Sequence, residues 1–442
     1  MMKSSDYIES LRKEFALYVI TNRAIPAITD GIKPAARRVL WTARDGKKHK
    51  SASLAGATLP LHPHSPPEGT INTLAAPYGN NYPLLKGYGA FGTCVNNTAY
   101  AASRYTSVEV SEFAKQILFK DIELVPMMEN YDSTLMEPVH FLPIVPIVLL
   151  NPADGIAVGF STTIAPRKLQ DVVDRQLDYL KGKKVTPTTP TFLPTNDVAT
   201  HRDSKWVFKG EVVRKNASNV TITRIPFGTS HAKILQNDNS KLNKLLDVDA
   251  ISDYEDRSRD SISIDVQFKR GEAGKLSDDQ LLTKLGLVVN VSENLNVLDF
   301  THKTVMGTND VEIITTFTEW RLGWYVARYE RLKSIIEDDI QKEVDIITAI
   351  DQQAGLVATK KQTKKDFDSW LQDIGIVNVS YISGLPTYRY TLDERAKVEK
   401  SLTTNREILS EYVTILGSED IRRAIYINEL KDIKKQFTGA VK

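Results

Sequence analysis

Arg104–Tyr105 is the pair of residues in this chain with the most specific chemistry. A tyrosine oxygen can attack the phosphorus of a phosphodiester, and an adjacent guanidinium can stabilise charge on the equatorial phosphate oxygens. The product would be a phosphotyrosyl link that conserves the bond energy for resealing. The dipeptide alone is weakly specific, because Arg328–Tyr329 and Arg389–Tyr390 repeat it in regions where structural tyrosines are the default.

Positive charge is concentrated near the N-terminus. Residues 23–50 contain eight basic and two acidic residues, whereas the whole chain of 442 residues has a net charge of only +2. Such a cluster is typical of a surface that holds phosphates, and a solvated helix face is the ordinary alternative.

Short helices followed by a glycine-rich hairpin are expected to position these residues. Apolar spacing and the prolines at helix starts predict helices at residues 6–23, 34–44 and 67–76. A glycine-rich turn region is expected at 87–95, and 105–119 should include a strand. This order favours a winged-helix (CAP-like) DNA-binding domain over residues 1–140, with one helix in the major groove.

The rest of the chain predicts two further domains in an α+β multidomain protein. Residues 141–317 predict an α/β tower domain, with a helix at 169–180, strands at 220–225 and 262–268, and a loop at 249–260. Residues 318–442 predict two long amphipathic helices in an antiparallel coiled coil, a small helical tip at about 352–390 and a third helix at 419–437. An arm of this kind suits homodimerisation.

Five blocks around Arg104–Tyr105 resemble the cleavage subunits of type IIA DNA topoisomerases. Asp30–Leu40 is similar to their DG-hydrophobic-KPxxRR segment, His62–His64 to HPH, Gly87–Gly92 to GxGNFG, Asn130–Asp132 to NYD and Gly155–Gly159 to GIAVG. The blocks stand in family order, and weaker resemblance continues to Ser418. The length is closest to that of phage-encoded members. One departure is Ser65–Glu68, where the family has a glycine, an acid and a serine in a longer segment.

The resemblance implies roles for individual residues. Tyr105 would be the nucleophile and Arg104 its transition-state partner. Ile164 would be a wedge between base pairs that bends the DNA. The implied DNA contacts near the cleaved phosphate are Arg23, Lys33, Arg37, Arg38, His62 and His64. Either histidine could also relay a proton, and the alternative for the His-Pro-His segment is a metal half-site or simple surface polarity.

Cofactors are expected on a partner chain. No paired Asp-x-Asp with a partnering Glu stands out as a magnesium site, and no ATP-binding element is visible. Gly87–Gly92 satisfies G-x-G-x-x-G but lacks the strand and helix of a dinucleotide site. We therefore expect no metal site in this chain, with Mg²⁺ and ATP bound by an ATPase/TOPRIM subunit. Two copies of this chain would supply two tyrosines for the two strands of duplex DNA.

The expected function is an ATP-dependent type II topoisomerase subunit that makes a transient double-strand break through a 5′-phosphotyrosyl link. Relaxation or decatenation is expected, because no basic wrapping domain follows the coiled coil. The alternative is a non-catalytic winged-helix regulator with a dimerising arm. A tyrosine recombinase is disfavoured, because none of the seven histidines has an arginine three residues later.

The expected location is the cytoplasm, in the host cell if the protein is phage-encoded. The single cysteine, Cys94, fits a reducing compartment, and the longest apolar run, at 141–150, is broken by Pro143 and Pro146. No membrane partner is expected.

Overall fold

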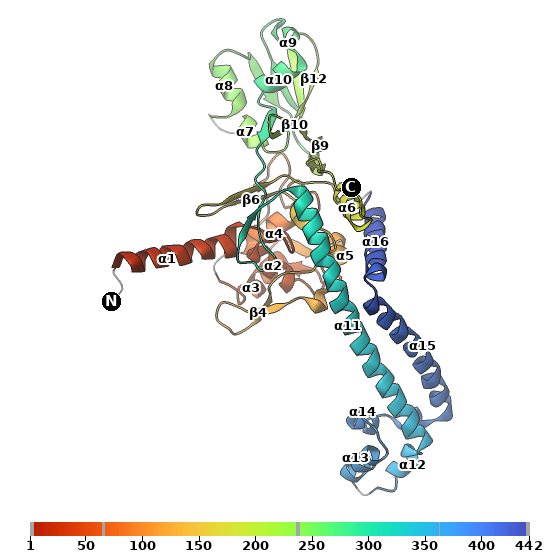
Figure 1. Cartoon of the computed structure of the whole chain (residues 1–442). Coiled ribbons are helices and arrows are strands. Elements are labelled where there is room, and N and C mark those ends of the chain that lie inside the picture. Colours follow the sequence, from red (N-terminus) through yellow and green to blue (C-terminus); the bar gives the residue numbers. More distant parts are fainter. Residues whose placement is uncertain (1–3, 64–66, 236–238, 362, 439–442) are drawn as a thin grey trace. The chain divides into compact units, whose positions relative to one another are not determined.

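The computed structural model describes residues 4–63, 67–235, 239–361 and 363–438. The chain divides into two compact units (Figure 1): Met1–Arg321 with Ile427–Lys442 form the first, and Leu322–Tyr426 form the second. The region 318–442, predicted as one domain, is thus shared between them. Helices and small antiparallel sheets make up the chain, in agreement with the predicted mixture of α and β structure.

The first unit begins with a group of helices. These are α1 (Ser4–Val19), the π-helical turn η1 (Ile20–Ala24), α2 (Pro34–Thr42), α3 (Ser51–Thr58) and α4 (Pro67–Ala75). The helix predicted at 6–23 therefore changes to a π turn at Ile20. Helix α3 was not predicted, because Ser, Ala, Gly and Thr supply most of its residues and give no apolar stripe.

A three-stranded antiparallel sheet follows these helices. Its order is β1 (His49–Lys50), β3 (Ser107–Val110) and β2 (Leu85–Tyr88). Lys50 pairs with Ser107, and Tyr88 pairs with Ser107 from the other side, so β3 is the central strand. Helix α5 (Glu112–Ile117) begins directly after β3, where the Ser111 hydroxyl accepts a hydrogen bond from the Ala114 N–H at 3.1 Å.

Two hairpins complete this part of the unit. The first pairs β4 (Met127–Glu129) with β5 (Met136–Pro138), and the second pairs β6 (Ala153–Ile156) with β7 (Ser161–Ile164). Short 3-10 helices lie at η2 (Ile122–Leu124) and η3 (Ile147–Leu149). Both hairpins carry residues that were singled out in the sequence.

Residues 165–307 contain both helices and strands. Helix α6 (Leu169–Leu180) has the predicted bounds. The predicted strands at 220–225 and 262–268 are found as β13 (Asn219–Arg224) and β15 (Ile264–Gln267), inside the four-stranded sheet β12-β13-β15-β14. The loop predicted at 249–260 is wrong at β14 (Asp253–Asp256), an edge strand whose charged, largely exposed residues resemble a loop in composition.

This region contains further helices, a second sheet and several short elements. Helices α7 (His231–Leu235), α8 (Lys241–Asp247), α9 (Glu272–Lys275) and α10 (Asp278–Lys284) accompany β12 (Glu211–Arg214) and its sheet. A second sheet has the order β10 (Thr200–Arg202), β11 (Lys205–Lys209), β16 (Val288–Val291). The remaining short elements are β8 (Thr191–Phe192), η4 (Leu193–Thr195), β9 (Asp197–Val198), β17 (Asn296–Leu298) and β18 (Val305–Gly307).

The second unit contains two long helices that run antiparallel. One is the part of α11 (Asp310–Asp351) from Leu322 onward, and the other is α15 (Leu392–Gly417). Arg395 bonds to Asp351 at 2.7 Å, Asn405 bonds to Glu343 at 3.0 Å, and the rings of Tyr329 and Tyr412 lie 5.6 Å apart. Between them lie α12 (Ala354–Ala358), α13 (Lys364–Asp373), α14 (Val379–Ser383) and η5 (Thr387–Tyr390), which share a small core; α16 (Glu419–Gln436) follows α15 and enters the first unit.

Gly31 shows how tightly the first unit is packed. Its φ is +67°, and a Cβ atom at this position would overlap the backbone of Val148. Gly182 has a nearly identical φ of +69° with open space around it. We expect Gly31→Ala to lower the free energy of unfolding by more than about 3 kcal/mol, and Gly182→Ala by only about 1 to 2 kcal/mol. Urea unfolding followed by circular dichroism measures both, and equal losses would show that the backbone overlap has no cost.

Candidate functional site

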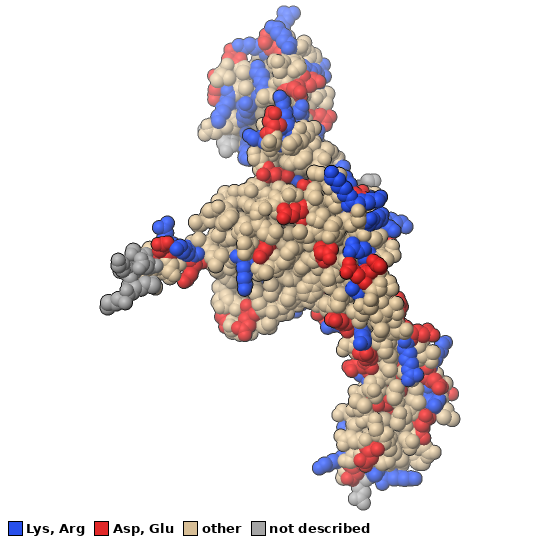
Figure 2. All heavy atoms as spheres, in the orientation of Figure 1, with Lys and Arg blue, Asp and Glu red and all other residues tan. Residues whose placement is uncertain are grey.

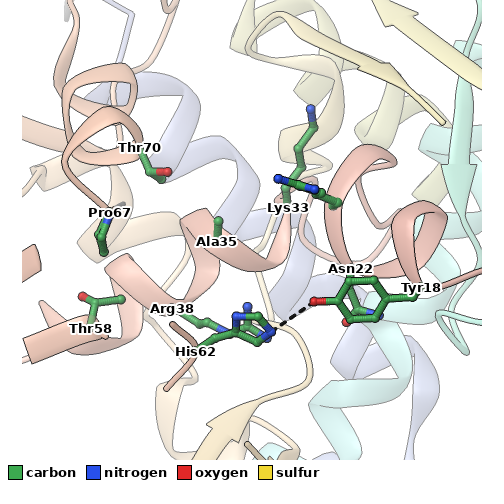
Figure 3. A pocket seen from close by; sticks show the side chains of 10 residues that line it. Tyr18, Asn22, Lys33, Ala35, Arg38, Thr58, His62, Pro67 and Thr70 are labelled. Atoms are coloured by element: carbon green, nitrogen blue, oxygen red, sulfur yellow. Dashed lines mark hydrogen bonds between the residues drawn. The ribbon is translucent and has the colours of Figure 1, made fainter. Parts of the chain in front are cut away.

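A small basic pocket gathers several of the predicted site residues (Figure 3). Its volume is about 140 Å³. It is lined by Tyr18, Asn22, Arg23, Lys33, Ala35, Arg38, Thr58, His62, Pro67 and Thr70. Four of the predicted DNA contacts, Arg23, Lys33, Arg38 and His62, therefore line one pocket. They come from η1, from α2 and the residue before it, and from the segment after α3. His64 lies outside the described residues.

His62 is held by two tyrosines. Its Nε2 atom lies 3.1 Å from the Tyr18 hydroxyl (Figure 3), and its ring lies 5.6 Å from the ring of Tyr131. Asn130, which precedes Tyr131, donates to the Pro60 carbonyl at 3.0 Å and accepts from the backbone of Thr134 at 2.9 Å. The hydrogen bonds of Asn130 thus fix the loop between β4 and β5, and this loop places the ring of Tyr131 against His62.

Arg37 belongs to the core of the unit and does not reach the pocket. Only 4% of its side chain is exposed, and its Nε and Nη2 atoms donate to the two carboxylate oxygens of Asp30 at 2.7 and 2.9 Å. Asp30 is fully buried and also accepts from the N–H groups of Ile32 and Phe141. Burial by itself raises the pKa of Asp30, but the charge and hydrogen bonds of Arg37 hold it below its usual value. The predicted DNA contact at Arg37 is therefore corrected to a structural role.

Arg38, one residue later on α2, faces the pocket. Its Nε and Nη2 atoms donate to the carboxylate of Glu137 on β5 at 2.5 and 2.9 Å. This paired contact uses two of the five guanidinium N–H groups and fixes the plane of the group. The others can meet a phosphate. Glu137 was not singled out in the sequence, because nothing in its local pattern shows that it lies opposite Arg38.

Lys33 joins the pocket to the β6–β7 hairpin. Its Nζ atom donates to the Asp154 carbonyl at 2.6 Å. Burial lowers the pKa of Lys33, and the Asp154 carboxylate partly offsets this. The neighbouring Gly155 has no room for a Cβ atom, which would overlap the carbonyl oxygen of Ala24 in η1. The base of the hairpin is therefore fixed against the π turn that carries Arg23.

The structure of the β6–β7 hairpin does not agree with the predicted role of Ile164 as a wedge between base pairs. Ile164 is only 1% exposed and lies at the base of the hairpin, paired with Ala153. A side chain buried in this way cannot insert between base pairs, so the prediction for Ile164 is corrected. The exposed apolar residues are at the other end of the hairpin, where Ile156 is 87% exposed, Val158 61% and Phe160 42%. The exposed end was missed because apolar character alone does not distinguish a packed isoleucine from a projecting one.

Tyr105 projects into solvent from a fixed backbone. Its side chain is 68% exposed, and the Arg104 guanidinium carbon lies 4.7 Å from the centre of its ring. The turn is anchored to α3, because Ser51 N–H donates to Thr106 O at 3.1 Å and the two hydroxyls are 2.8 Å apart. Tyr105 and Arg104 are not among the described residues that line the basic pocket.

The other two Arg-Tyr pairs have different surroundings. Arg328 is 8% exposed and lies over the ring of Tyr325 at 4.3 Å. The Tyr390 hydroxyl donates to the Ile382 carbonyl at 2.6 Å. Of the three pairs, Arg104–Tyr105 is therefore the one that presents its phenol to solvent on a turn of the first unit.

The described part of the chain lacks two further features. No three His, Cys, Asp or Glu side chains among those residues converge in a way that could hold a metal ion. No described helix combines the length and apolar character needed to cross a membrane.

The comparisons with known proteins agree on one family. The family model that describes the A subunits of DNA gyrase and topoisomerase IV matches residues 23–431. The chain is 28% identical over 415 residues to the DNA topoisomerase medium subunit of Enterobacteria phage T4, covering 89% of this chain and 91% of that one. It is 26% identical over 470 residues to the DNA gyrase A subunit of Aminobacterium colombiense, covering 96% and 56%. The chain therefore spans nearly all of the phage relative and about half of the gyrase relative.

A solved structure shows the same fold. The crystal structure of the Plasmodium falciparum topoisomerase II DNA-binding, cleavage and re-ligation domain matches with a TM-score of 0.81 at 19% sequence identity. The match covers 95% of this chain and 63% of that one.

Arg23 and Arg37 provide a direct test of the site. Arg23 is exposed at the pocket, so Arg23→Ala should leave the free energy of unfolding unchanged and weaken duplex DNA binding, with the slope of log K against log salt reduced by about one. Arg37→Ala leaves the buried Asp30 carboxylate unpaired, so we expect a loss of about 3 to 5 kcal/mol in unfolding free energy. Urea unfolding and salt-dependent fluorescence anisotropy measure the two effects. A stable Arg37→Ala variant with a specific DNA-binding defect would restore the original interpretation.

Proposed function

Because the chain belongs to the family of DNA gyrase and topoisomerase IV A subunits, we propose that it is the DNA-cleaving subunit of an ATP-dependent type II topoisomerase. The observation that carries the proposal is Tyr105, an exposed phenol on an anchored turn beside Arg104. Similarity to the phage T4 medium subunit over nearly the full length of both chains supports it. In this proposal the enzyme relaxes or decatenates DNA.

The proposed reaction is a transesterification at phosphorus. The Tyr105 oxygen forms a bond to the phosphorus of a DNA strand, and the bond from phosphorus to the 3′ oxygen of the neighbouring sugar breaks. The phenolic proton is lost and the departing 3′ oxygen gains one, so the strand ends in a free 3′ hydroxyl and a 5′-phosphotyrosyl link. Arg104 stabilises charge on the equatorial oxygens as the bond forms. The reverse reaction reseals the strand without outside energy.

The basic pocket would hold the DNA backbone near the attacked phosphate. Arg23, Lys33 and Arg38 supply positive charge, and His62 supplies a ring nitrogen that can donate to or accept from a phosphate oxygen. Tyr105 lies outside the lining of this pocket. We propose that two copies of the chain act together, so that two tyrosines serve the two strands of the duplex. Helices α2 to α4 with the sheet β1-β3-β2 would act as a winged-helix domain on the duplex.

The second unit is the proposed dimerisation arm. Several exposed apolar side chains lie within or next to the helical tip at about 352–390: Leu392 is 78% exposed, Val377 67% and Tyr388 64%. Apolar surface of this kind is costly in water and suits contact with an identical surface related by twofold symmetry.

Helix α1 is a candidate contact for an ATPase/TOPRIM subunit. Phe15 is 64% exposed, Ile8 56% and Tyr7 55%, so one helix presents several large apolar residues to solvent. We propose that this partner binds Mg²⁺ and ATP.

Ile156 replaces Ile164 as the proposed wedge. It is the most exposed apolar residue of the β6–β7 hairpin, and the base of that hairpin contacts Lys33 of the basic pocket. An apolar side chain held beside a phosphate-binding surface can enter between base pairs and bend the duplex.

Tyr105→Phe tests the chemistry. With the ATPase partner, Mg²⁺ and supercoiled DNA, we expect this variant to bind DNA normally but to form no covalent adduct after a detergent quench, since it lacks the attacking oxygen. Arg104→Ala should slow cleavage by about 10² to 10³. Tyr100→Phe is the matched control, because Tyr100 is also exposed in the same segment, at 50%. A non-catalytic regulator predicts no adduct with any variant, and an adduct on Tyr105→Phe would transfer the role to another residue.

Ile156→Ala tests the wedge. We expect less bending of a duplex labelled at both ends, measured by fluorescence energy transfer, together with reduced cleavage, because alanine is too short to separate a base step. Val158→Ala removes a second exposed apolar side chain from the same hairpin and should have a smaller effect. Equal bending by Ile156→Ala and the wild type would refute the proposed role.

A further inference from the structure

A second concentration of positive charge lies on the first unit, outside the basic pocket. We define the α6–α16 basic patch by Lys181, Lys183, Lys184, Lys431 and Lys435, all of which are exposed. Figure 2 shows Lys and Arg gathered at the edge where Figure 1 places α6 and the C-terminal part of α16. None of these five lysines lines the basic pocket.

Two segments distant in sequence are held together at this patch. The Gln170 side chain donates to the Phe437 carbonyl at 3.1 Å, and Lys434 donates to Asp174 at 2.5 Å. The rings of Phe113 and Phe437 lie 5.4 Å apart, which fixes the end of α16 against α5. The packing of the unit therefore brings the lysines of both segments to one surface.

The three lysines after α6 stand on a rigid helix end. The N–H of Gly182 bonds to Tyr179 O at 2.9 Å, and the N–H of Lys183 bonds to Asp178 O at 2.8 Å. Gly182, with φ +69°, supplies the left-handed residue that ends the helix. Lysines here also stabilise the negative end of the α6 dipole. The same effect applies to Lys435 in the last turn of α16, but it does not explain why the two helix ends present their lysines on one surface.

The acidic residues of the two segments do not neutralise the patch. Residues 168–184 and 427–438 contain eight basic and five acidic residues. Three of the acids already have partners: Asp174 pairs with Lys434, Asp178 with Arg175 and Glu429 with Lys120. Asp171 and Asp432 remain beside the five patch lysines, so the surface keeps a net positive charge, which suits a ligand with regularly spaced negative charges.

We propose that the α6–α16 basic patch binds the phosphate backbone of duplex DNA beyond the segment held at the basic pocket. The proposal rests on the proposed function, because it takes DNA as the substrate. Flexible lysine side chains make point-charge contacts without selecting a sequence. Each phosphate that they neutralise contributes about 0.9 to the salt dependence of binding. Long DNA then has two anchoring regions on the chain, and short DNA has one.

The experiment compares short and long DNA. The triple variant Lys181→Ala, Lys183→Ala, Lys184→Ala is made in the Tyr105→Phe background, so that binding is measured without cleavage. Its control is Lys360→Ala, Lys361→Ala, Lys364→Ala, an equal change of charge at exposed lysines of the second unit. Binding is measured across a salt series with a duplex of about 20 base pairs, roughly two helical turns, and with linear plasmid DNA.

The expected result is a loss confined to long DNA. The slope of log K against log salt should fall by about two to three for plasmid DNA, with short-duplex binding unchanged, and Lys431→Ala with Lys435→Ala should act in the same direction. Unchanged plasmid binding, an equal loss in the control, or an equal loss on the short duplex would overturn the proposal. So would binding of phosphatidylglycerol vesicles that depends on the patch while plasmid binding does not. Failure of the cleavage proposal would appear separately, in the Tyr105 adduct assay.

Discussion

The buried bond between Asp30 and Arg37 is the interaction on which the site depends. Asp30 takes up donors from Arg37, from its own loop at Ile32 and from the distant Phe141, so one carboxylate joins the start of α2 to the segment before η3. Gly31 allows the backbone to pass against Val148 at the same point. Because α2 is held in this way, Lys33 at its N-terminus and Arg38 within it line the basic pocket. Burying a charged carboxylate is costly because the charge loses its contact with water. Here the hydrogen bonds to Asp30 offset this cost and fix a single geometry.

The neighbouring arginines show what sequence can and cannot predict about this site. Four of the predicted DNA contacts line one pocket, and that they bind DNA stays a prediction. The sequence did not predict that Arg37 binds the buried Asp30 whereas Arg38 lines the pocket, because two adjacent arginines look alike without the carboxylates beside them. Glu137 was missed for the same reason. Its role depends on a pairing across residues far apart in the chain.

The fold was predicted best where periodicity is long and regular. Helix α6 and the long helices α11 and α15 have clear apolar spacing, and strands β13 and β15 are rich in β-branched residues. Prediction failed at α3, whose small residues give no stripe, and at β14, whose charges face solvent at a sheet edge. The sequence also did not show that Ile156 is exposed and Ile164 is buried, because exposure in a hairpin depends on which end is anchored. The winged-helix, coiled-coil and cofactor expectations, and the role of Tyr105, stay predictions.

The β6–β7 hairpin is fixed at one end and open at the other. Gly155 leaves no space for substitution beside Ala24, and Lys33 binds the adjacent carbonyl, whereas a methyl group added at Gly159 near the turn would meet nothing within 4 Å and Val158 reaches solvent. Mutations therefore meet opposite constraints within a few residues of one another. Substitutions in the turn can therefore change the exposed apolar surface of the hairpin, while the contacts of Gly155 and Lys33 at its base stay the same.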